Sequence, residues 1–181
     1  MKKFTLIQKF RNKIRVKGTL NLDISKKAKL VRCSITSIGQ NNTLIVEDGT
    51  VLRGVELEII GDNSAIVISK NCIIGDNCYL SAKDGCKLSI KDGCMLSRNI
   101  KLMTSDGHPI YQNEIMINKA KDITIKNNVW LADNVTILKG VEVGDGSIVG
   151  INSTLTKSIA RNVIAVGNPA KVVKEGITWA E

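Results

Sequence analysis

The chain has 181 residues, enough for one domain with a sizeable core, and its formal net charge is +9. Hydrophobic residues make up 43% of the sequence but aromatic residues only 3%, so we expect an aliphatic core, which favours stacked strands over a helical bundle. No apolar run approaches the ~18 residues of a transmembrane helix. The apolar run near the N-terminus, FTLI, is too short for a signal peptide, so we expect a cytoplasmic protein.

Residues 1–15 form a basic N-terminal segment. Residues 1–32 contain eleven Lys or Arg and a single acid, Asp23, whereas the rest of the chain is almost neutral. Two interpretations stay open: the segment caps the core, or residues 1–17 bind an acidic polymer or the inner membrane surface. The apolar residues of the segment recur at steps of three and four, as in a short amphipathic helix, and are Phe4, Ile7, Phe10 and Ile14.

A six-residue repeat runs without interruption from residue 125 to residue 160. Its units read IKNNVW, LADNVT, ILKGVE, VGDGSI, VGINST and LTKSIA, with an aliphatic residue in first place and a small or aliphatic one in fifth place. A period of six excludes an α-helix and predicts short strands joined by turns, with two inward residues per unit. Gly144 and Gly150, in second place, are interpreted as turn residues with unusual backbone angles. Earlier units begin at Ile38, Ile68, Ile74, Ile90 and Leu96, with two-residue insertions expected at solvent-facing corners.

The five cysteines follow this repeat and lack the spacing of a zinc site or a CxxC motif. They are expected to be small buried core residues in a reducing compartment. With one histidine and no acidic cluster in the sequence, no metal site is expected.

This pattern resembles the hexapeptide-repeat acyltransferases. The resemblance implies an all-β fold, a left-handed parallel β-helix of triangular cross-section over residues 16–165, with three units in each coil and three chains side by side as a homotrimer. Residues 166–181 contain the run VGNPAKVV and resemble the segment that closes the prism in sugar and serine acetyltransferases, before a short tail that often turns helical. The residues themselves support a solenoid with an aliphatic interior, whereas its handedness and the trimer rest on the resemblance.

The repeat breaks off at residues 103–122, MTSDGHPIYQNEIMINKAKD. This stretch is more polar than its flanks, contains the turn sequence SDGH and holds the only histidine of the chain, His108. It resembles the S-D-x-H-x-I segment of the capsule, polysialic-acid and colanic-acid O-acetyltransferases. The resemblance implies an extruded loop that carries a catalytic histidine into a cleft between subunits, where acetyl-coenzyme A lies.

His108 is our candidate for the general base. A neutral imidazole can take the proton of an attacking hydroxyl at cellular pH and return it to the departing thiolate. Asp106 either orients the imidazole or caps the turn, and Glu114 and Asp122 are weaker candidates for the orienting role. The residues of the same loop that are expected to bind the substrate are Ser105, Tyr111 and Gln112.

Trp130 is the second candidate for a catalytic role. It occupies the sixth place of its unit and should point outward, on a prism that is poor in aromatic residues. The related polysaccharide O-acetyltransferases have a functional tryptophan in the NVW segment that follows the histidine loop, and NNVWLADNV resembles that segment. Its expected roles are packing against substrate or cofactor, or donating its indole N–H within the cleft.

The acyl donor that the resemblance implies is acetyl-coenzyme A. Small residues would let its pantetheine arm approach the backbone, and cations suit its phosphates. The residues expected to bind it are Trp130, Ala132, Gly150, Ser153, Lys157 and Lys171. The sequence contains no P-loop and no GxGxxG motif, so nucleotide hydrolysis and dinucleotide binding are not expected.

The leading prediction is an acetyl-coenzyme A-dependent O-acetyltransferase that modifies a sugar hydroxyl of a capsule, an O-antigen or a precursor of these. Three alternatives stay open: N-acetylation of a nucleotide-linked amino sugar, acetylation of serine, a simple sugar or an antibiotic, and a non-catalytic β-helix scaffold. A scaffold would not need the loop or its histidine. Nucleic-acid binding is not expected, because the body of the chain is almost neutral and poor in aromatic residues.

Overall fold

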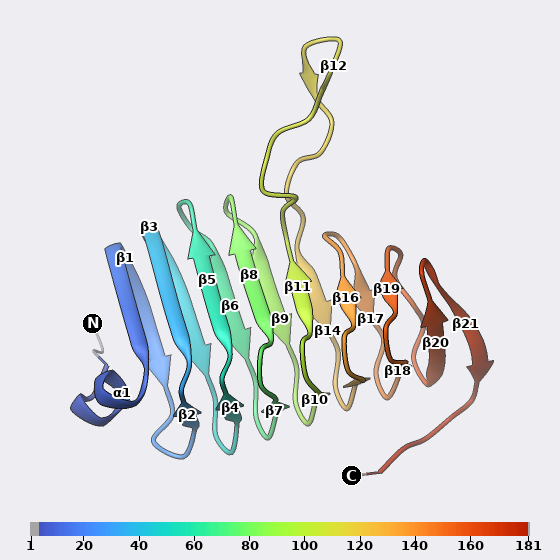
Figure 1. Ribbon diagram of the computed structural model, residues 1–181, viewed down its shortest axis with the longest axis horizontal. Helices are drawn as coiled ribbons and strands as arrows, with labels where there is room; N and C mark the ends of the chain where they lie inside the picture. The colour runs from blue at the N-terminus through green and yellow to red at the C-terminus, as the bar shows by residue number, and fades with distance from the viewer. Residues whose placement is uncertain (1–3, 181) are drawn as a thin grey trace.

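The protein is described by a computed structural model that covers residues 4–180. Residues 1–3, which belong to the predicted basic segment, and residue 181 lie outside the described residues. Figure 1 shows a solenoid of short strands lying side by side, with a small helix at the N-terminal end and a long loop that leaves one edge. The expected all-β solenoid is confirmed.

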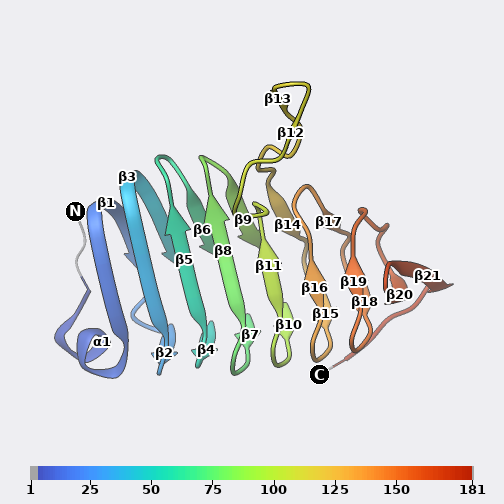
Figure 2. The same ribbon diagram turned by 45° about the horizontal axis from the view of Figure 1, so that its top comes forward.

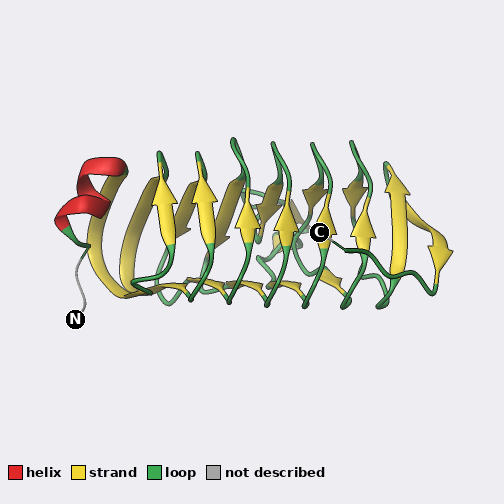
Figure 3. Ribbon diagram, turned by 90° about the horizontal axis from the view of Figure 1, so that it is seen from below, coloured by secondary structure: helices red, strands yellow, loops and turns green. Residues whose placement is uncertain are grey.

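The strands lie on three faces, named here the front, back and bottom face after their places in Figure 1. The front face contains β5 (Glu56–Ile60), β8 (Tyr79–Lys83), β11 (Lys101–Met103), β16 (Thr136–Ile137) and β19 (Thr154–Leu155). The back face contains β6 (Ala65–Ile68), β9 (Lys87–Ile90), β14 (Ile123–Ile125) and β17 (Glu142–Val143). The bottom face, turned toward the viewer in Figure 3, contains β2 (Lys29–Val31), β4 (Val51–Arg53), β7 (Ile73–Ile74), β10 (Met95–Leu96), β15 (Trp130–Leu131), β18 (Ile148–Val149) and β20 (Val163–Gly167).

The first two coils contain strands long enough to cross from one face to the next. These strands are β1 (Lys13–Ile24) and β3 (Ser34–Val46). Residues 34–38 of β3 pair with β5 on the front face, and residues 43–46 pair with β6 on the back face. The cross-section is therefore triangular, as expected.

The inward residues of the C-terminal coils are those that the repeat predicts. The first-place residues are at most 1% exposed and are Ile125, Leu131, Ile137, Val143, Val149 and Leu155. The fifth-place residues Val129, Val135, Val141, Ser147 and Ser153 are at most 2% exposed. Each large aliphatic side chain buried in this way stabilises the fold by about 1.5–3 kcal/mol relative to an exposed one.

The coils of the N-terminal half are longer than three hexapeptides. Ile73 pairs with Met95, 22 residues further on, whereas Trp130 pairs with Ile148, 18 residues further on. Front and back strands of the longer coils carry three inward residues, as in the front-face set Val55, Leu57 and Ile59. The expected insertions therefore lengthen strands rather than corners.

The repeat unit predicted to begin at Ile38 is displaced by one residue, because this strand is also longer than a hexapeptide strand. Ser37 is fully buried, whereas Ile38 is only half-buried and points away from the core. The first-place residues of the other early units are buried as expected and are Ile68, Ile74, Ile90 and Leu96.

Four of the five cysteines are small buried core residues, as expected, and the expectation is wrong for Cys86. Cys33, Cys72, Cys78 and Cys94 are buried, and only Cys86 is half-exposed. Burial raises the pKa of Cys78 to about 11, so its thiol stays protonated at neutral pH.

The corners of the repeat turn through a residue with left-handed backbone in fourth place. These residues are Asn128 (φ 53°), Asn134 (φ 61°), Gly140 (φ 78°), Gly146 (φ 66°) and Asn152 (φ 57°). Glycine and asparagine adopt this conformation more readily than other residues, so their recurrence in fourth place is the sequence signal for the corners.

Gly144 and Gly150 are needed for a different reason. Their φ angles lie outside the left-handed range, so their interpretation as residues with unusual backbone angles is wrong. A Cβ on Gly144 would lie 2.4 Å from the backbone nitrogen of Arg161, and a Cβ on Gly150 would lie 2.6 Å from Cγ1 of Val166. The next coil therefore lies too close to leave room for a side chain.

Both ends of the solenoid differ from the sequence expectation. The N-terminal helix α1 (Leu6–Arg11) leaves out Phe4 and Ile14, so the four apolar residues do not share one helical face. At the other end, β20 and β21 (Ala170–Glu175) form an antiparallel pair, and the tail beyond Gly176 is extended. Residues 4–180 contain neither a C-terminal helix nor a helix long and apolar enough to cross a membrane.

Replacing Gly144 with alanine should lower the stability of the prism by about 1–3 kcal/mol, because the added methyl group meets backbone atoms that cannot rotate away. Thermal unfolding followed by circular dichroism measures the effect. Thr156→Ala is the control, because Thr156 also occupies second place in its unit and is exposed. Equal midpoints for the two variants would contradict the close approach of the coils.

Candidate active site

The loop at residues 103–122 leaves the prism at the corner between the front and back faces. It connects β11 to β14 and carries a small antiparallel hairpin of β12 (Tyr111–Gln112) and β13 (Ile115–Met116). The backbone N–H of Lys121 donates to the carbonyl of Thr104 at 2.9 Å, which closes the loop at its base. Figures 1 and 2 show the loop standing clear of the prism, so the expected extrusion is present.

Asn118 holds the two sides of the loop together. Its Nδ2 donates to the carbonyl of His108 and to Oδ2 of Asp106, each at 2.9 Å, and its Oδ1 accepts the N–H of Ile110 at 2.7 Å. Lys139, from a corner of the next coil, donates to the carbonyl of Asn118 at 2.8 Å and forms an ion pair with Asp106. The position of His108 therefore depends on Asn118 and Lys139, which the sequence analysis missed.

The carboxylate of Asp106 bonds to Lys139 and Asn118, and none of the bonds in the described residues joins it to the imidazole of His108. The hydrogen bond from Lys139 lowers the pKa of Asp106, and the bond from Asn118 adds to the effect. A lowered pKa means that this contact stabilises the loop at neutral pH and is lost as the pH falls through the pKa of the folded state. The turn itself is capped by Ser105, whose Oγ accepts the N–H of Gly107 at 3.2 Å.

His108 lies on the wall of a pocket of about 580 Å³. Its side chain is exposed, and no hydrogen bond or ion pair joins the imidazole to another residue of the described chain. Both ring nitrogens are therefore available to a ligand. Other residues on the pocket wall are Asp84, Ser105, Met116, Asn118 and Lys119.

The remaining loop candidates lie away from this pocket or have structural partners. Tyr111 and Gln112 are exposed on β12, in the arm beyond the pocket. Glu114 lies at the hairpin tip, with a φ of 64°. Asp122 belongs to the prism, because its Oδ1 accepts the N–H of Lys87 at 2.8 Å. No hydrogen bond or ion pair joins any of these side chains to His108 in the described chain.

Trp130 points outward from the bottom face, as expected, and is half-buried. Its Nε1 lies 3.3 Å from Oγ of Ser97, to which it donates, and its ring centroid lies 5.9 Å from that of Trp179. The C-terminal tail brings Trp179 there by crossing back over the bottom face, as Figure 3 shows, and Nε1 of Trp179 donates to the carbonyl of Asn128 at 2.8 Å. The sequence did not predict that the C-terminal tail packs beside Trp130.

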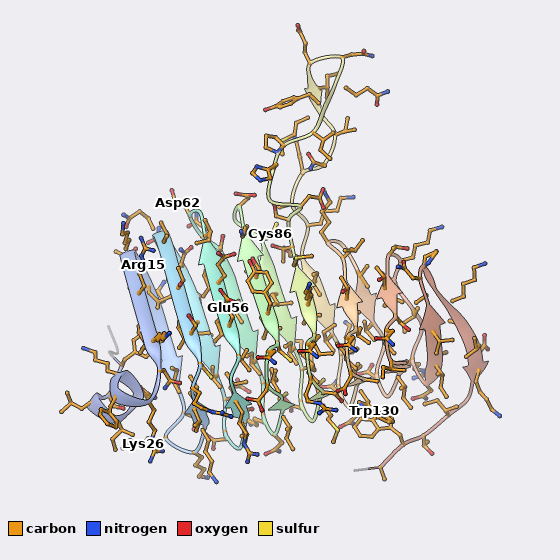
Figure 4. All side chains as sticks on the ribbon, viewed as in Figure 1. Arg15, Lys26, Glu56, Asp62, Cys86 and Trp130 are labelled. Atoms are coloured by element: carbon orange, nitrogen blue, oxygen red, sulfur yellow. The ribbon has the colours of Figure 1, made fainter. Side chains whose placement is uncertain are left out.

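The loop and Trp130 lie on opposite sides of the prism. Figure 4 places Trp130 at the bottom edge, whereas the loop leaves from the top. A single chain therefore does not bring His108 and Trp130 together.

The residues expected to bind the acyl donor lie in the C-terminal half of the prism. Ala132 and Gly150 stand next to each other on the bottom face, since Leu131 pairs with Val149 in the preceding register position. Lys157 and Lys171 are exposed. Ser153 is fully buried, and its Oγ accepts the N–H of Gly167 at 2.9 Å, so its side chain faces the core. Residues 4–180 contain no cluster of three or more potential metal ligands.

Comparison with known proteins gives the family. The family described as bacterial transferase hexapeptide (six repeats) matches residues 122–157. A putative acetyltransferase of Saccharomyces cerevisiae is 32% identical over 169 residues, which cover 85% of this chain and 83% of the yeast protein. The chain belongs to the hexapeptide-repeat acetyltransferases.

Solved structures agree with this family assignment. The crystal structure of the polysialic acid-specific acetyltransferase NeuO matches with a TM-score of 0.70 and 35% identity, over 92% of this chain and 88% of that chain. Galactoside acetyltransferase in complex with coenzyme A matches with a TM-score of 0.54 and 34% identity, over 61% of this chain and 55% of that one. The expected left-handed parallel β-helix is confirmed.

The curated relatives differ in length from this hexapeptide-repeat acetyltransferase. A polysialic acid O-acetyltransferase of Escherichia coli is 39% identical over 129 residues, which cover 70% of this chain but 35% of that protein. The match therefore spans about a third of the bacterial protein and most of the yeast one.

In this hexapeptide-repeat acetyltransferase, Asn118→Ala should loosen the loop without unfolding the prism, because the side chain makes three bonds within the loop and none to the core. We expect amide hydrogen exchange at residues 106–118 to be at least about tenfold faster than in the wild type. Hydrogen exchange read by mass spectrometry tests this. The control is Lys119→Ala, since Lys119 is the exposed neighbour of Asn118; indistinguishable rates in the two variants would refute the anchoring role.

Proposed function

We propose that this protein transfers an acetyl group from acetyl-coenzyme A to a hydroxyl group of a sugar, with His108 as the general base. The observation that carries the proposal is the unpaired imidazole of His108 on the wall of a pocket, in a loop that interrupts a hexapeptide prism. Relatives named for this reaction act on polysialic acid and on galactoside.

The chemistry requires one proton to move twice. A ring nitrogen of His108 takes the proton of the sugar hydroxyl while the oxygen attacks the thioester carbonyl carbon. The tetrahedral intermediate then collapses, the carbon–sulfur bond breaks, and the imidazolium returns the proton to the leaving thiolate. The products are the acetyl ester of the sugar and free coenzyme A. His108 suits both steps because its imidazole has no competing partner within the described chain.

We propose that the complete site lies between two subunits of a homotrimer. Direct transfer requires the base, the hydroxyl and the thioester to lie within about 3–3.5 Å of one another along the reaction. In one chain, His108 and Trp130 are on opposite sides of the prism. A neighbouring prism would bring the loop of one subunit to the bottom face of the next and so complete the site.

We assign acetyl-coenzyme A to the bottom face beside Trp130. Ala132 and Gly150 have little or no side chain and let an extended arm lie close to the backbone. Lys171 on β21 is an exposed cation for the phosphate groups, whereas Lys157 lies between β19 and Ile159, at the corner between the front and back faces, and is not part of this assignment. The contribution of Ser153 is through its backbone, because its side chain is buried. A relative of this chain, galactoside acetyltransferase, was solved in complex with coenzyme A.

We assign the acceptor to the pocket beside His108. Ser105 and Asp84 offer hydrogen-bonding groups to sugar hydroxyls, and Lys119 offers a cation to an acidic sugar. This combination fits a sugar of a surface polysaccharide, such as a capsule or O-antigen, or its precursor.

His108→Ala should lower kcat by at least about 100-fold, which is the usual contribution of a positioned general base. The assay measures the release of free thiol from acetyl-coenzyme A with a panel of glycans and confirms the product by mass. Ile115→Ala is the matched control, because Ile115 is exposed in the same loop and lies outside the pocket. If His108→Ala retains most of its activity, the proposed base is wrong.

Mixing His108→Ala with Trp130→Ala should restore activity if each site takes its loop from one subunit and its donor face from another. Random assembly from equal amounts gives about a quarter of the sites both intact parts. The control mixes His108→Ala with the variant that carries both substitutions, which should stay inactive. If both single variants are inactive and no activity returns on mixing, the intersubunit site is refuted; an active Trp130→Ala would refute the role of Trp130.

A further inference from the structure

The helix α1 turns its polar side toward the prism and its apolar side toward solvent. Gln8 is half-buried and Asn12, directly after the helix, is buried, whereas Leu6, Ile7 and Phe10 are 86%, 65% and 93% exposed. A helix that capped the core would have the opposite orientation. The interpretation of the basic segment as a core cap therefore holds only for Phe4 and Ile14, which pack against the core.

Hydrogen bonds fix the helix in this orientation. Nδ2 of Asn12 donates to the carbonyls of Gln8 at 2.8 Å and Leu30 at 3.2 Å, and its Oδ1 accepts the N–H of Cys33 at 2.8 Å. The side chains of Thr5 and Gln8 form a reciprocal capping box at the start of the helix. The outward direction of Leu6 and Phe10 is thus built into the fold rather than being a result of a loose end.

Cations without ion-pair partners lie at the same end of the solenoid as the exposed apolar residues. They lie on α1 and on the front half of β1, are all exposed, and are Lys9, Arg11, Lys13, Arg15 and Lys17. The structure records no salt bridge for any of them within residues 4–180. Asp23, the one acid of this region, belongs to the part of β1 that pairs with the back half of β3. Figure 4 shows Arg15 and Lys26 at this same end of the solenoid.

We propose that this N-terminal end, made of α1 and the front half of β1, docks onto an anionic phospholipid surface. Leu6, Ile7 and Phe10 enter the boundary between headgroups and acyl chains, and the five cations lie against the headgroups. This arrangement is typical of helices that lie in the plane of a membrane surface, which combine an apolar side with flanking Lys and Arg.

Neither a second copy of the chain nor a soluble polyanion fits this surface as well as a lipid surface does. A second copy bound end to end would bring two sets of five unpaired cations together, which like-charge repulsion opposes. A soluble polyanion would neutralise the cations but would leave Leu6 and Phe10 in water. An anionic lipid surface satisfies both the charge and the apolar residues. The proposal does not depend on the acetyltransferase activity.

Co-sedimentation of the full-length protein with lipid vesicles tests the proposal. We expect binding to phosphatidylcholine vesicles that contain about 30% phosphatidylglycerol to be at least about tenfold stronger than binding to phosphatidylcholine alone, and to weaken as salt is added. Replacing Leu6 and Phe10 together by glutamine should weaken binding to the anionic vesicles at least about tenfold, and so should Lys13→Glu with Arg15→Glu. Circular dichroism should show unchanged folding, because all four side chains are exposed.

Two further measurements make the outcome decisive. Val173→Gln is the matched control, because Val173 is 62% exposed at the opposite end of the solenoid, and it should bind vesicles like the wild type. Retention on immobilised heparin should fall only for the charge variant. If the Leu6 and Phe10 variant binds anionic vesicles as tightly as the wild type, the surface is a site for soluble polyanions and the proposal is overturned. Absence of vesicle binding by the wild type overturns it as well.

Discussion

The parallel stacking of coils is the constraint on which the other features of this protein depend. The backbone N–H groups of one coil donate to the carbonyls of the next, as in the bonds of 2.9 Å from Ser34 to Val55 and from Trp130 to Ser147. Every corner must therefore return the chain to the same path, and most corners do so through a residue with left-handed backbone, usually Asn or Gly. The short distance between coils also leaves no room for a side chain at Gly144.

The spacing of residues in the sequence predicts the interior of the solenoid well and its dimensions less well. The period of six places Leu131 and Val135 in the core, because each inward position repeats with the coil. The same period misplaces Ile38. Its strand is longer than in the C-terminal coils, so side chains continue to alternate between core and solvent and the next six-residue unit no longer begins at an inward position. The space available beside a residue such as Gly144 depends on the backbone of the next coil, which the residues of its own repeat unit do not reveal.

The candidate site shows a similar division. His108 and Trp130 are conspicuous in the sequence because each departs from a regular pattern, and the structure places both on the surface. Asn118 and Lys139 do not depart from a regular pattern. Their role in holding the loop comes from contacts between the loop and a corner of another coil, which the sequence does not display. Asp106 could not be assigned for the same reason: its strongest partner, Lys139, is 33 residues away in the sequence.

The closure of the loop at Thr104 and Lys121 separates two parts of the molecule that evolution can then change independently. Met95 and Trp130 are neighbours on the bottom face although 35 residues separate them, whereas 18 residues separate Trp130 from Ile148. An insertion nearly as long as a coil is thus accommodated without disturbing the ladder on either side. Natural variation or protein engineering can therefore change the loop without changing the strands beside Trp130.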